Sequence, residues 1–314
     1  MYPFIMIGNI DFFLYDVISF IGSYIVMFYN DLRVKNKLRP VGYKTMIVRA
    51  NLSQNHGKIS RYLVNTMPVL ESETFTMAYI MFVFLNRILG DAIGTGANYF
   101  GAFFIVPILW IMLSVNYGAN PLEQLDFIST CLPFYLIFVK LSCFTAGCCM
   151  GIPWEHGMYN ITEDQYQVPV QLIEAFWGVL ILIILTIYRK KAKVGTVFPM
   201  YAILYCSTRF CSEFLRIEEN VLGPLKIYHI LCLIGIVYGI IFWIVVAKCR
   251  DKVNAYYDKK YAEAEEELVE INKVVEVENE KYRRQMQSEQ QKKENKKKRN
   301  ERQKKAKSSV AKKL

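Results

Sequence analysis

The chain has 314 residues, of which 53% are hydrophobic, 14% aromatic and 21% charged, and its formal net charge is +10. This composition excludes a disordered or collagen-like protein, because such chains lack large apolar side chains or carry a regular glycine repeat. The charge is concentrated at the C-terminal end, where residues 248–314 hold 21 Lys and Arg against 13 Asp and Glu. The part before residue 248 is therefore nearly neutral and strongly apolar.

Apolar segments long enough to cross about 30 Å of hydrocarbon recur along this first part. We predict an all-α, polytopic membrane protein with about seven transmembrane helices, at Ile10–Tyr29, Thr74–Ile93, Tyr99–Val115, Phe127–Gly147, Val170–Tyr188, Thr196–Leu215 and Ile227–Ala247. The first segment is expected to be a retained helix, because no basic region precedes it and no small-residue cleavage site follows it.

The basic residues predict the orientation, because Lys and Arg accumulate in cytoplasmic connections. Eight lie between residues 30 and 68 and four between residues 188 and 194, whereas residues 151–167 carry none. Seven spans with the N-terminus outside and the C-terminus in the cytoplasm place all basic regions on the inner side.

Eight cysteines raise the question of disulfides or bound metal. Six lie within or beside predicted spans, and only Cys148 and Cys149 approach the outer face. Adjacent cysteines rarely pair with each other, and their C-x4-C-C spacing from Cys143 departs from the C-x2-C pairs of zinc sites. We therefore predict free thiols that pack as small apolar groups, and neither a metal nor a cofactor.

Glycines at a spacing of four occur at Gly147/Gly151 and Gly235/Gly239. Small residues at this spacing allow close helix packing, which we expect for the second pair. The first pair ends a helix where the chain turns outward, and there the glycines could also leave room for a ligand.

Charged residues inside predicted spans are costly in lipid unless they face partners or water. Seven of them lie within or at the ends of these helices: Arg87, Asp91, Lys140, Glu174, Arg209, Glu213 and Arg216. Helical spacing places five polar residues on one face of the sixth helix: Tyr201, Tyr205, Arg209, Glu213 and Arg216. This stripe is either an internal ion pair between Arg209 and Glu213 or a site for a phosphate headgroup or ion.

Three segments of the sequence resemble a known family: residues 126–151 with Lys140-Leu-Ser-Cys-Phe-Thr-Ala-Gly-Cys-Cys-Met-Gly151, Pro169–Ala175, and 195–216 with Tyr205-Cys-Ser-Thr-Arg-Phe-Cys-Ser-Glu-Phe-Leu-Arg216. They are similar to the G-R-x-G-N-F-x-N-x-E-x-x-G, P-x-Q-L-Y-E-A and Y-G-x-x-R-F-x-x-E-x-x-R motifs of the bacterial prolipoprotein diacylglyceryl transferases. The resemblance covers about residues 5–247 and none of the tail.

The chain departs from the family signature at several positions. Lys140 stands for its Arg, Cys143 for its Asn and Cys148 for its Glu, which gives the C-F-x-A-G-C-C-x-G form of a divergent branch. Two family histidines are replaced, by Val168 and within Phe100-Gly101-Ala102. The resemblance retains Tyr205, Arg209, Glu213, Gln171, Glu174 and Gly151, with Tyr15 as a match for a tyrosine of the first helix.

The resemblance implies transfer of a diacylglyceryl group from phosphatidylglycerol to the cysteine thiol of a preprolipoprotein, in the bacterial plasma membrane. The substrate supplies the nucleophile, so the enzyme needs none of its own. The implied catalytic residues are Arg209, which holds the phosphate, Glu213, which accepts the thiol proton, and Tyr205. The implied substrate-binding residues are Lys140, Arg216, Gln171, Glu174, Gly151 and Tyr15.

Two other classes remain open on the sequence alone. A catalytically inactive membrane adaptor would explain the replaced signature residues. A small-solute carrier would explain the buried charges, although the sequence shows no paired internal repeats of the kind that many transporters have.

Three domains are expected: a membrane domain over 1–247, a charged cytoplasmic helix over 248–290 and a disordered polybasic tail over 291–314. A heptad seam over residues 257–282 is a candidate homo-dimer interface. The tail is expected to be solvated or to adhere to anionic lipid, and it lacks the aromatic residues that nucleic-acid binding favours. His56, His156 and His229 are expected to be solvated or interfacial.

Overall fold

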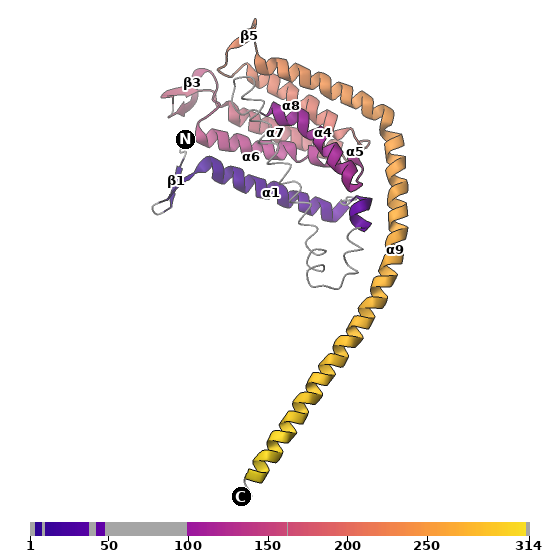
Figure 1. Ribbon diagram of the computed structural model, residues 1–314. Helices are drawn as coiled ribbons and strands as arrows, with labels where there is room; N and C mark the ends of the chain where they lie inside the picture. Colours follow the sequence, from indigo (N-terminus) through magenta and orange to yellow (C-terminus); the bar gives the residue numbers. More distant parts are fainter. Residues whose placement is uncertain (1–3, 8–9, 38–41, 48–98, 162, 312–314) are drawn as a thin grey trace. The chain divides into compact units, whose positions relative to one another are not determined.

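The computed structural model describes residues 4–7, 10–37, 42–47, 99–161 and 163–311. The chain forms two compact units, one of Met1–Thr45 with Met67–Tyr261 and one of Met46–Thr66 with Ala262–Leu314. The first unit contains a bundle of helices and every candidate site residue that is described (Figure 1). The predicted span Thr74–Ile93, with Arg87 and Asp91, lies outside the described residues, as does His56.

The chain begins with two short antiparallel strands, β1 (Phe4–Ile7) and β2 (Ile10–Phe13), followed by helix α1 (Leu14–Lys37). The first predicted helix therefore starts at Leu14 instead of Ile10. The isoleucine and two phenylalanines of β2 favour a strand, and pairing with β1 satisfies backbone groups that a helix would otherwise satisfy.

Helix α4 (Phe100–Tyr117) agrees with its predicted span, but the next prediction, Phe127–Gly147, corresponds to two helices, α5 (Pro121–Ser129) and α6 (Leu132–Ala146). The side chain of Asn120 accepts the N–H of Leu122 at 3.0 Å and caps α5. Pro133 breaks the path between the two helices, because proline lacks the N–H that a continuing helix needs.

Asp126 on α5 holds the beginning of helix α8 (Val197–Glu213). Its carboxylate accepts the backbone N–H groups of Gly195 at 2.6 Å, Val197 at 2.9 Å and Phe198 at 3.3 Å. The first N–H groups of a helix have no partner within the helix, so a carboxylate at this position stabilises the end of α8. This contact fixes where α8 starts, and with it the register of the polar stripe.

Helix α7 (Val170–Tyr188) matches its prediction. Helix α6 packs against both α1 and α7, and α7 packs against α8. The Gly235/Gly239 pair on helix α9 (Ile227–Ala311) lies against α8, where a Cβ atom at Gly235 would come within 2.4 Å of Cys206 Sγ and one at Gly239 within 3.2 Å of Ala202 Cβ. The expected close helix packing at this pair is confirmed.

Two small hairpins follow α6 and α8. Strand β3 (Pro153–Asn160) pairs with β4 (Gln165–Gln167), and β5 (Asn220–Leu222) pairs with β6 (Leu225–Lys226). A single bridge between Gly151 and Arg216 joins the two connections that carry them. The fold is mostly helical, with strands confined to these short hairpins and to β1–β2 among the described residues.

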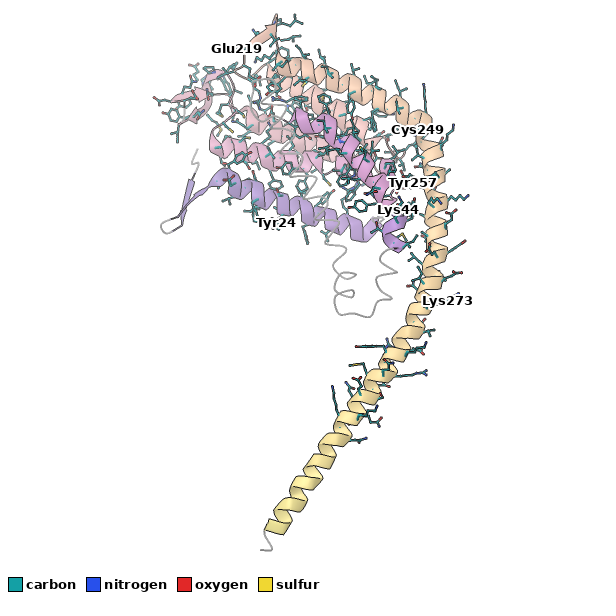
Figure 2. All side chains as sticks on the ribbon, viewed as in Figure 1. Tyr24, Lys44, Glu219, Cys249, Tyr257 and Lys273 are labelled. Carbon is teal, nitrogen blue, oxygen red and sulfur yellow. The ribbon has the colours of Figure 1, made fainter. Side chains whose placement is uncertain are left out.

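The last helix, α9, is assigned over Ile227–Ala311, so it includes residues 291–311, where the sequence analysis expected disorder. Lys, Glu, Gln and Arg dominate this stretch and all have high helix propensity, which accounts for the difference. Near its middle, Tyr257, labelled in Figure 2, is buried, and Tyr261 packs edge-on against Tyr43 with ring centroids 6.4 Å apart. These two positions of the heptad seam are therefore already covered within the chain.

By length and composition, three helical stretches among the described residues could cross a membrane: Pro121–Ala146, Val170–Tyr188 and Ile227–Val274. Leu14–Val26 and Phe103–Tyr117 are shorter apolar helices. Large apolar side chains such as Phe20 and Ile187 are more than 60% exposed, a surface that suits lipid better than water. These findings support a membrane location.

Candidate functional site

The buried carboxylate of Glu174 on α7 forms ion pairs with basic side chains from two other parts of the chain. Its Oε2 atom lies 2.5 Å from Lys140 Nζ on α6 and 2.9 Å from Arg216 Nη2 after α8. Its Oε1 atom accepts a hydrogen bond from Arg209 on α8. Three cations, one from α6 and two from the end of α8 and the residues after it, therefore meet at one carboxylate.

The second carboxylate of the cluster is that of Glu213. Its Oε2 atom lies 2.7 Å from Arg209 Nη2 and 3.8 Å from Arg216 Nε. The i,i+4 pair predicted between Arg209 and Glu213 is confirmed. Helix α8 ends at Glu213, and Arg216 lies just beyond, where it can reach both carboxylates.

All five charged side chains are secluded from solvent: Glu213 is fully buried, Glu174 is 4% exposed and Lys140, the most open, is 16% exposed. Buried charges are strongly unfavourable unless they are paired and hydrogen-bonded. Lys140, Arg209 and Arg216 against Glu174 and Glu213 leave one net positive charge. Lys226, also buried, adds a further positive charge beside Glu213 and Arg216, so the surroundings suit an anionic ligand.

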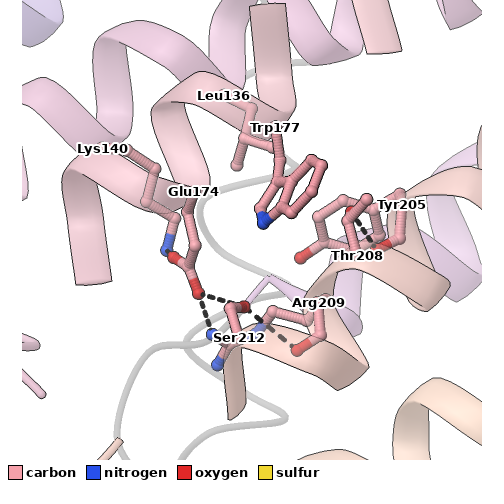
Figure 3. Close-up of a pocket in the computed structure, with 8 residues that line it drawn as sticks. All are labelled: Leu136, Lys140, Glu174, Trp177, Tyr205, Thr208, Arg209 and Ser212. Atoms are coloured by element: carbon pink, nitrogen blue, oxygen red, sulfur yellow. Dashed lines mark hydrogen bonds and ion pairs between the residues drawn. The ribbon is translucent and has the colours of Figure 1, made fainter. Parts of the chain in front are cut away.

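A small pocket lies beside this cluster. Figure 3 shows the side chains that line it: Leu136, Lys140, Glu174, Trp177, Tyr205, Thr208, Arg209 and Ser212. The cavity thus combines apolar walls with Lys140, Glu174 and Arg209, an arrangement common in sites that bind amphipathic ligands.

Tyr205 is fixed by other aromatic rings. Its ring lies 4.7 Å from that of Tyr99 and 5.9 Å from that of Tyr201, measured between centroids. Its exposed fraction is 4%, and it lines the pocket. The predicted placement of Tyr205 next to Arg209 is therefore realised, because both lie on the same face of α8.

The remaining predicted binding residues are placed differently. Gln171 on α7 is fully buried and donates from Nε2 to the carbonyl of Cys148, and it does not line the pocket. A Cβ atom at Gly151 would come within 2.5 Å of the Leu215 carbonyl oxygen, so backbone fills the room that a ligand was expected to use. Tyr15 lies in the first turn of α1 and also does not line this pocket.

The sequence analysis did not identify several residues that support the cluster. Ser212 Oγ donates to Glu174 Oε1 at 3.2 Å, and Lys226 Nζ donates to the carbonyl oxygens of Glu213 at 2.8 Å and Arg216 at 2.5 Å. Lys226 thereby satisfies carbonyls at the end of α8, a role typical of basic residues near helix C-termini. Ser212 follows Arg209 by three residues, a spacing that places both on the same side of a helix and could have indicated a shared partner.

His229 was expected at an interface but is fully buried. Its Nδ1 atom accepts the backbone N–H of Lys226 at 3.0 Å, and its ring lies 4.3 Å from Phe214 and 4.8 Å from Phe210, between centroids. These two aromatic rings cover it, which hydropathy alone does not predict. By contrast, His156 is exposed, as expected.

Glu218, in the connection after α8, is a further titratable neighbour. Burial raises its pKa to about 7, helped by the negative charge of Glu213. Arg209 and Arg216 act in the opposite direction. Near neutral pH, the connection therefore holds a carboxyl group that readily gains or loses a proton beside the cluster.

The cysteines after α6 are arranged in a way that the spacing did not predict. The thiols of Cys143, Cys148 and Cys149 lie within 4.8 Å of one another, and none forms a disulfide. Cys148 and Cys149 are exposed, as expected. Metal binding was considered unfavourable because of the C-x4-C-C spacing, but Gly147 and Cys149 adopt left-handed backbone conformations and the three thiols converge despite that spacing.

A model of the prolipoprotein diacylglyceryl transferase family matches residues 4–245 of the chain. The chain belongs to this family. Family membership places the polar stripe of α8 and the segment of α7 that carries Glu174 inside the matched region, together with the cysteine-rich turn. The tail beyond residue 245 lies outside it.

Curated relatives are similar over shorter stretches. A phosphatidylglycerol–prolipoprotein diacylglyceryl transferase of Clostridium kluyveri is 40% identical over 91 residues, 29% of this chain and 35% of that protein. The enzyme of Clostridioides difficile is 36% identical over 110 residues, which are 34% of this chain and 42% of that protein. The enzyme of Campylobacter jejuni is 30% identical over 165 residues, which are 49% of this chain and 59% of that protein. The chain thus spans about a third to three fifths of the relatives it matches.

Proposed function

We propose that this protein transfers a diacylglyceryl group from phosphatidylglycerol to the cysteine thiol of a prolipoprotein, the activity for which its relatives are named. One observation carries the proposal: Lys140, Arg209 and Arg216 meet around Glu174, and Lys140 and Arg209 also line an apolar-walled pocket. A phospholipid needs the same combination of cations for its phosphate and apolar surface for its chains.

The charge balance favours a phosphodiester. Phosphatidylglycerol carries one negative charge, and the excess of positive charge in the cluster favours an anionic headgroup. Arg209 and Arg216 offer planar guanidinium groups that can donate parallel hydrogen bonds to phosphate oxygens, while Lys140 acts as a point charge. Glu174, whose oxygens are taken by cations, would position these donors instead of touching the lipid.

The proposed reaction displaces a phosphate ester. The acceptor sulfur attacks the glyceryl carbon, a C–S bond forms, the C–O bond to phosphate breaks, and glycerol phosphate leaves with the bonding electrons. Arg209 stabilises the charge that develops on the leaving oxygen. Glu213 accepts the thiol proton, and the Tyr205 hydroxyl orients the lipid headgroup.

The membrane topology and the domain boundaries are part of the same proposal. We infer a multi-pass protein of the bacterial plasma membrane with seven spans, the N-terminus outside and the domains divided at residues 247 and 290. The basic connection of Arg189, Lys190, Lys191 and Lys193 at one end of α7 and the acidic β3–β4 hairpin near the other end support this orientation. The tail would then adhere to anionic lipid, and dimerisation would use the part of the seam after Tyr261.

Complementation tests the activity. A strain depleted of its own transferase receives the wild-type chain or Arg209→Lys, and lipoprotein acylation is read by mass spectrometry of a reporter lipoprotein. We expect acylation with wild type and its loss with Arg209→Lys. Arg250→Lys, outside the cluster, is the matched control and should behave as wild type. Absence of acylation with a stably expressed wild-type chain would overturn the proposal and favour the inactive adaptor, which the replaced signature residues Lys140, Cys143 and Cys148 would fit.

A further inference from the structure

The turn after α6 brings three thiols together outside the pocket described above. Cys143 lies in the last turn of α6, and Cys148 and Cys149 follow Gly147. Their sulfur atoms lie within 4.8 Å of one another, the one group of three metal-ligating side chains found among the described residues. The phosphate chemistry proposed for the cluster makes no use of them.

The backbone is built to hold this arrangement. Gly147 has a φ angle of 73° and Cys149 of 60°. The second value is costly for a residue with a side chain, and such conformations persist only where the surroundings enforce them. The N–H of Cys148 bonds back to the Cys143 carbonyl at 3.2 Å, which places the thiol of Cys148 over the end of the helix.

Two buried amide side chains fix the same turn. Gln171 Nε2 donates to the carbonyl of Cys148, and Asn160 Nδ2 donates to the carbonyl of Gly147 at 3.3 Å. Gln171 is fully buried and Asn160 is 2% exposed. Hydrogen bonds from α7 and from the β3–β4 hairpin therefore stabilise the left-handed conformation of the turn.

Simple packing does not account for these thiols. Cys143 is buried, but Cys148 and Cys149 are exposed, so they do not serve as small apolar core groups. Three sulfur atoms bound to one zinc ion at about 2.3 Å would lie about 3.8 Å apart. The present separations of up to 4.8 Å need to shorten by only about 1 Å, which small side-chain rotations can provide. The exposed side of the turn gives an ion a path of entry.

We propose that Cys143, Cys148 and Cys149 bind one Zn²⁺ ion as three thiolates, with a fourth coordination position open to solvent. Soft thiolate sulfur selects thiophilic ions over Mg²⁺ and Ca²⁺. Three thiolates and Zn²⁺ leave one negative charge, and Lys140 and Arg216 lie within electrostatic range of Cys149 to offset it. A monovalent ion such as Cu⁺ would leave two negative charges and is the less favoured occupant.

Metal analysis tests the site independently of transferase activity. The full chain is purified in detergent with reductant, equilibrated with Zn²⁺, dialysed against metal-free buffer and analysed for zinc per chain by mass spectrometry. We expect about one zinc per chain in wild type, and at least a tenfold lower content in Cys148→Ser and Cys149→Ser. Cys211→Ser, an exposed cysteine on α8 outside the group, is the matched control and should retain the metal.

A spectroscopic measurement identifies the ligands. With Co²⁺ in place of Zn²⁺, three thiolate ligands should give strong sulfur-to-cobalt charge-transfer absorption in wild type that weakens with each serine substitution. Cys143→Ser alters a buried position, so thermal unfolding checks that each variant is folded. If Cys143→Ser does not fold, the variants of the exposed residues, Cys148→Ser and Cys149→Ser, decide the result. Wild type without zinc, or zinc that persists in folded Cys148→Ser and Cys149→Ser, would overturn the proposal.

Discussion

The Nζ atom of Lys140 on α6 lies 2.5 Å from Oε2 of Glu174 on α7. This contact joins two neighbouring helices through the same carboxylate that binds Arg209 and Arg216. Where the family signature has an arginine, this chain places an ammonium group, which makes a point contact instead of a planar fork. The two arginines from α8 and the connection after it therefore supply the directed hydrogen bonds of the cluster.

Replacing Lys140 should weaken the structure more than a surface mutation does. In Lys140→Met, Glu174 loses one of three cationic partners but keeps two, so we expect a loss of about 1–3 kcal/mol in the free energy of unfolding. Thermal unfolding in detergent measures it. Lys140→Arg restores the residue of the family signature and should unfold within a few degrees of wild type. If Lys140→Met unfolded like wild type, the contact would carry no stability.

Arg209→Lys should lower transferase activity about 100-fold or more, because an ammonium group cannot make the parallel hydrogen bonds that a guanidinium makes to phosphate. The measurement is transfer from phosphatidylglycerol to a lipobox peptide by purified protein, together with lipid binding. Arg250→Lys serves as the control. Retention of binding and turnover within a factor of two would contradict the assignment of Arg209 to the phosphate.

Glu213→Gln separates a base from a counter-ion. If Glu213 accepts the thiol proton, the rate should fall about 100-fold or more while the unfolding temperature falls little, since Arg209 keeps its contact with Glu174. If Glu213 only balances charge, activity and stability should decline together. An unchanged rate would contradict both roles. Rate and thermal unfolding are measured on the same preparation.

Much of the site was predictable because its residues share one helical face. Tyr205, Arg209 and Glu213 follow i,i+4 steps on α8, and burial of the stripe follows from the apolar residues around it. Glu174 was named as a charge inside a predicted span and again from the resemblance, and its pairing with three cations depends on how α6, α7 and α8 pack. Helix packing of this kind is not encoded in the spacing within any one segment.

The features that the sequence analysis missed involve local breaks in regular structure. The thiols converge because Gly147 and Cys149 adopt left-handed conformations, and the first helix is shortened because residues 10–13 pair as a strand. His229 is buried by the rings of Phe210 on α8 and Phe214 just after it, a contact between two consecutive helices. Period and hydropathy describe regular elements, and they carry little information on turns and on contacts between helices.

Stability should depend on pH through Glu218. Its pKa is raised to about 7 in the folded protein, from about 4.3 in an unfolded chain. A raised pKa of an acid favours folding while the group is protonated, so this contribution is complete below about pH 4 and is lost as the pH rises through about 7. Glu218→Gln should therefore remove part of the fall in unfolding temperature between about pH 5 and pH 8.

The control for this prediction is Glu219→Gln, which alters the exposed neighbouring carboxylate shown in Figure 2. It should leave the pH profile of the unfolding temperature unchanged. Thermal unfolding of wild type and both variants across this range makes the comparison. Identical profiles for wild type and Glu218→Gln would show that Glu218 does not titrate in this way.

The hydrogen bonds between the Asp126 carboxylate and the start of α8 affect which sequence changes this region can accept. The carboxylate binds backbone N–H groups, so the identities of the side chains in the first turn of α8 matter little to the contact. Val197 and Phe198 are 3% and 1% exposed, so only apolar replacements that fill the same core positions would leave the helix in place. An inserted or deleted residue between Phe198 and Arg209, however, would rotate Arg209 by about 100° about the helix axis, away from Glu174. The segment should tolerate changes of residue far better than changes of length.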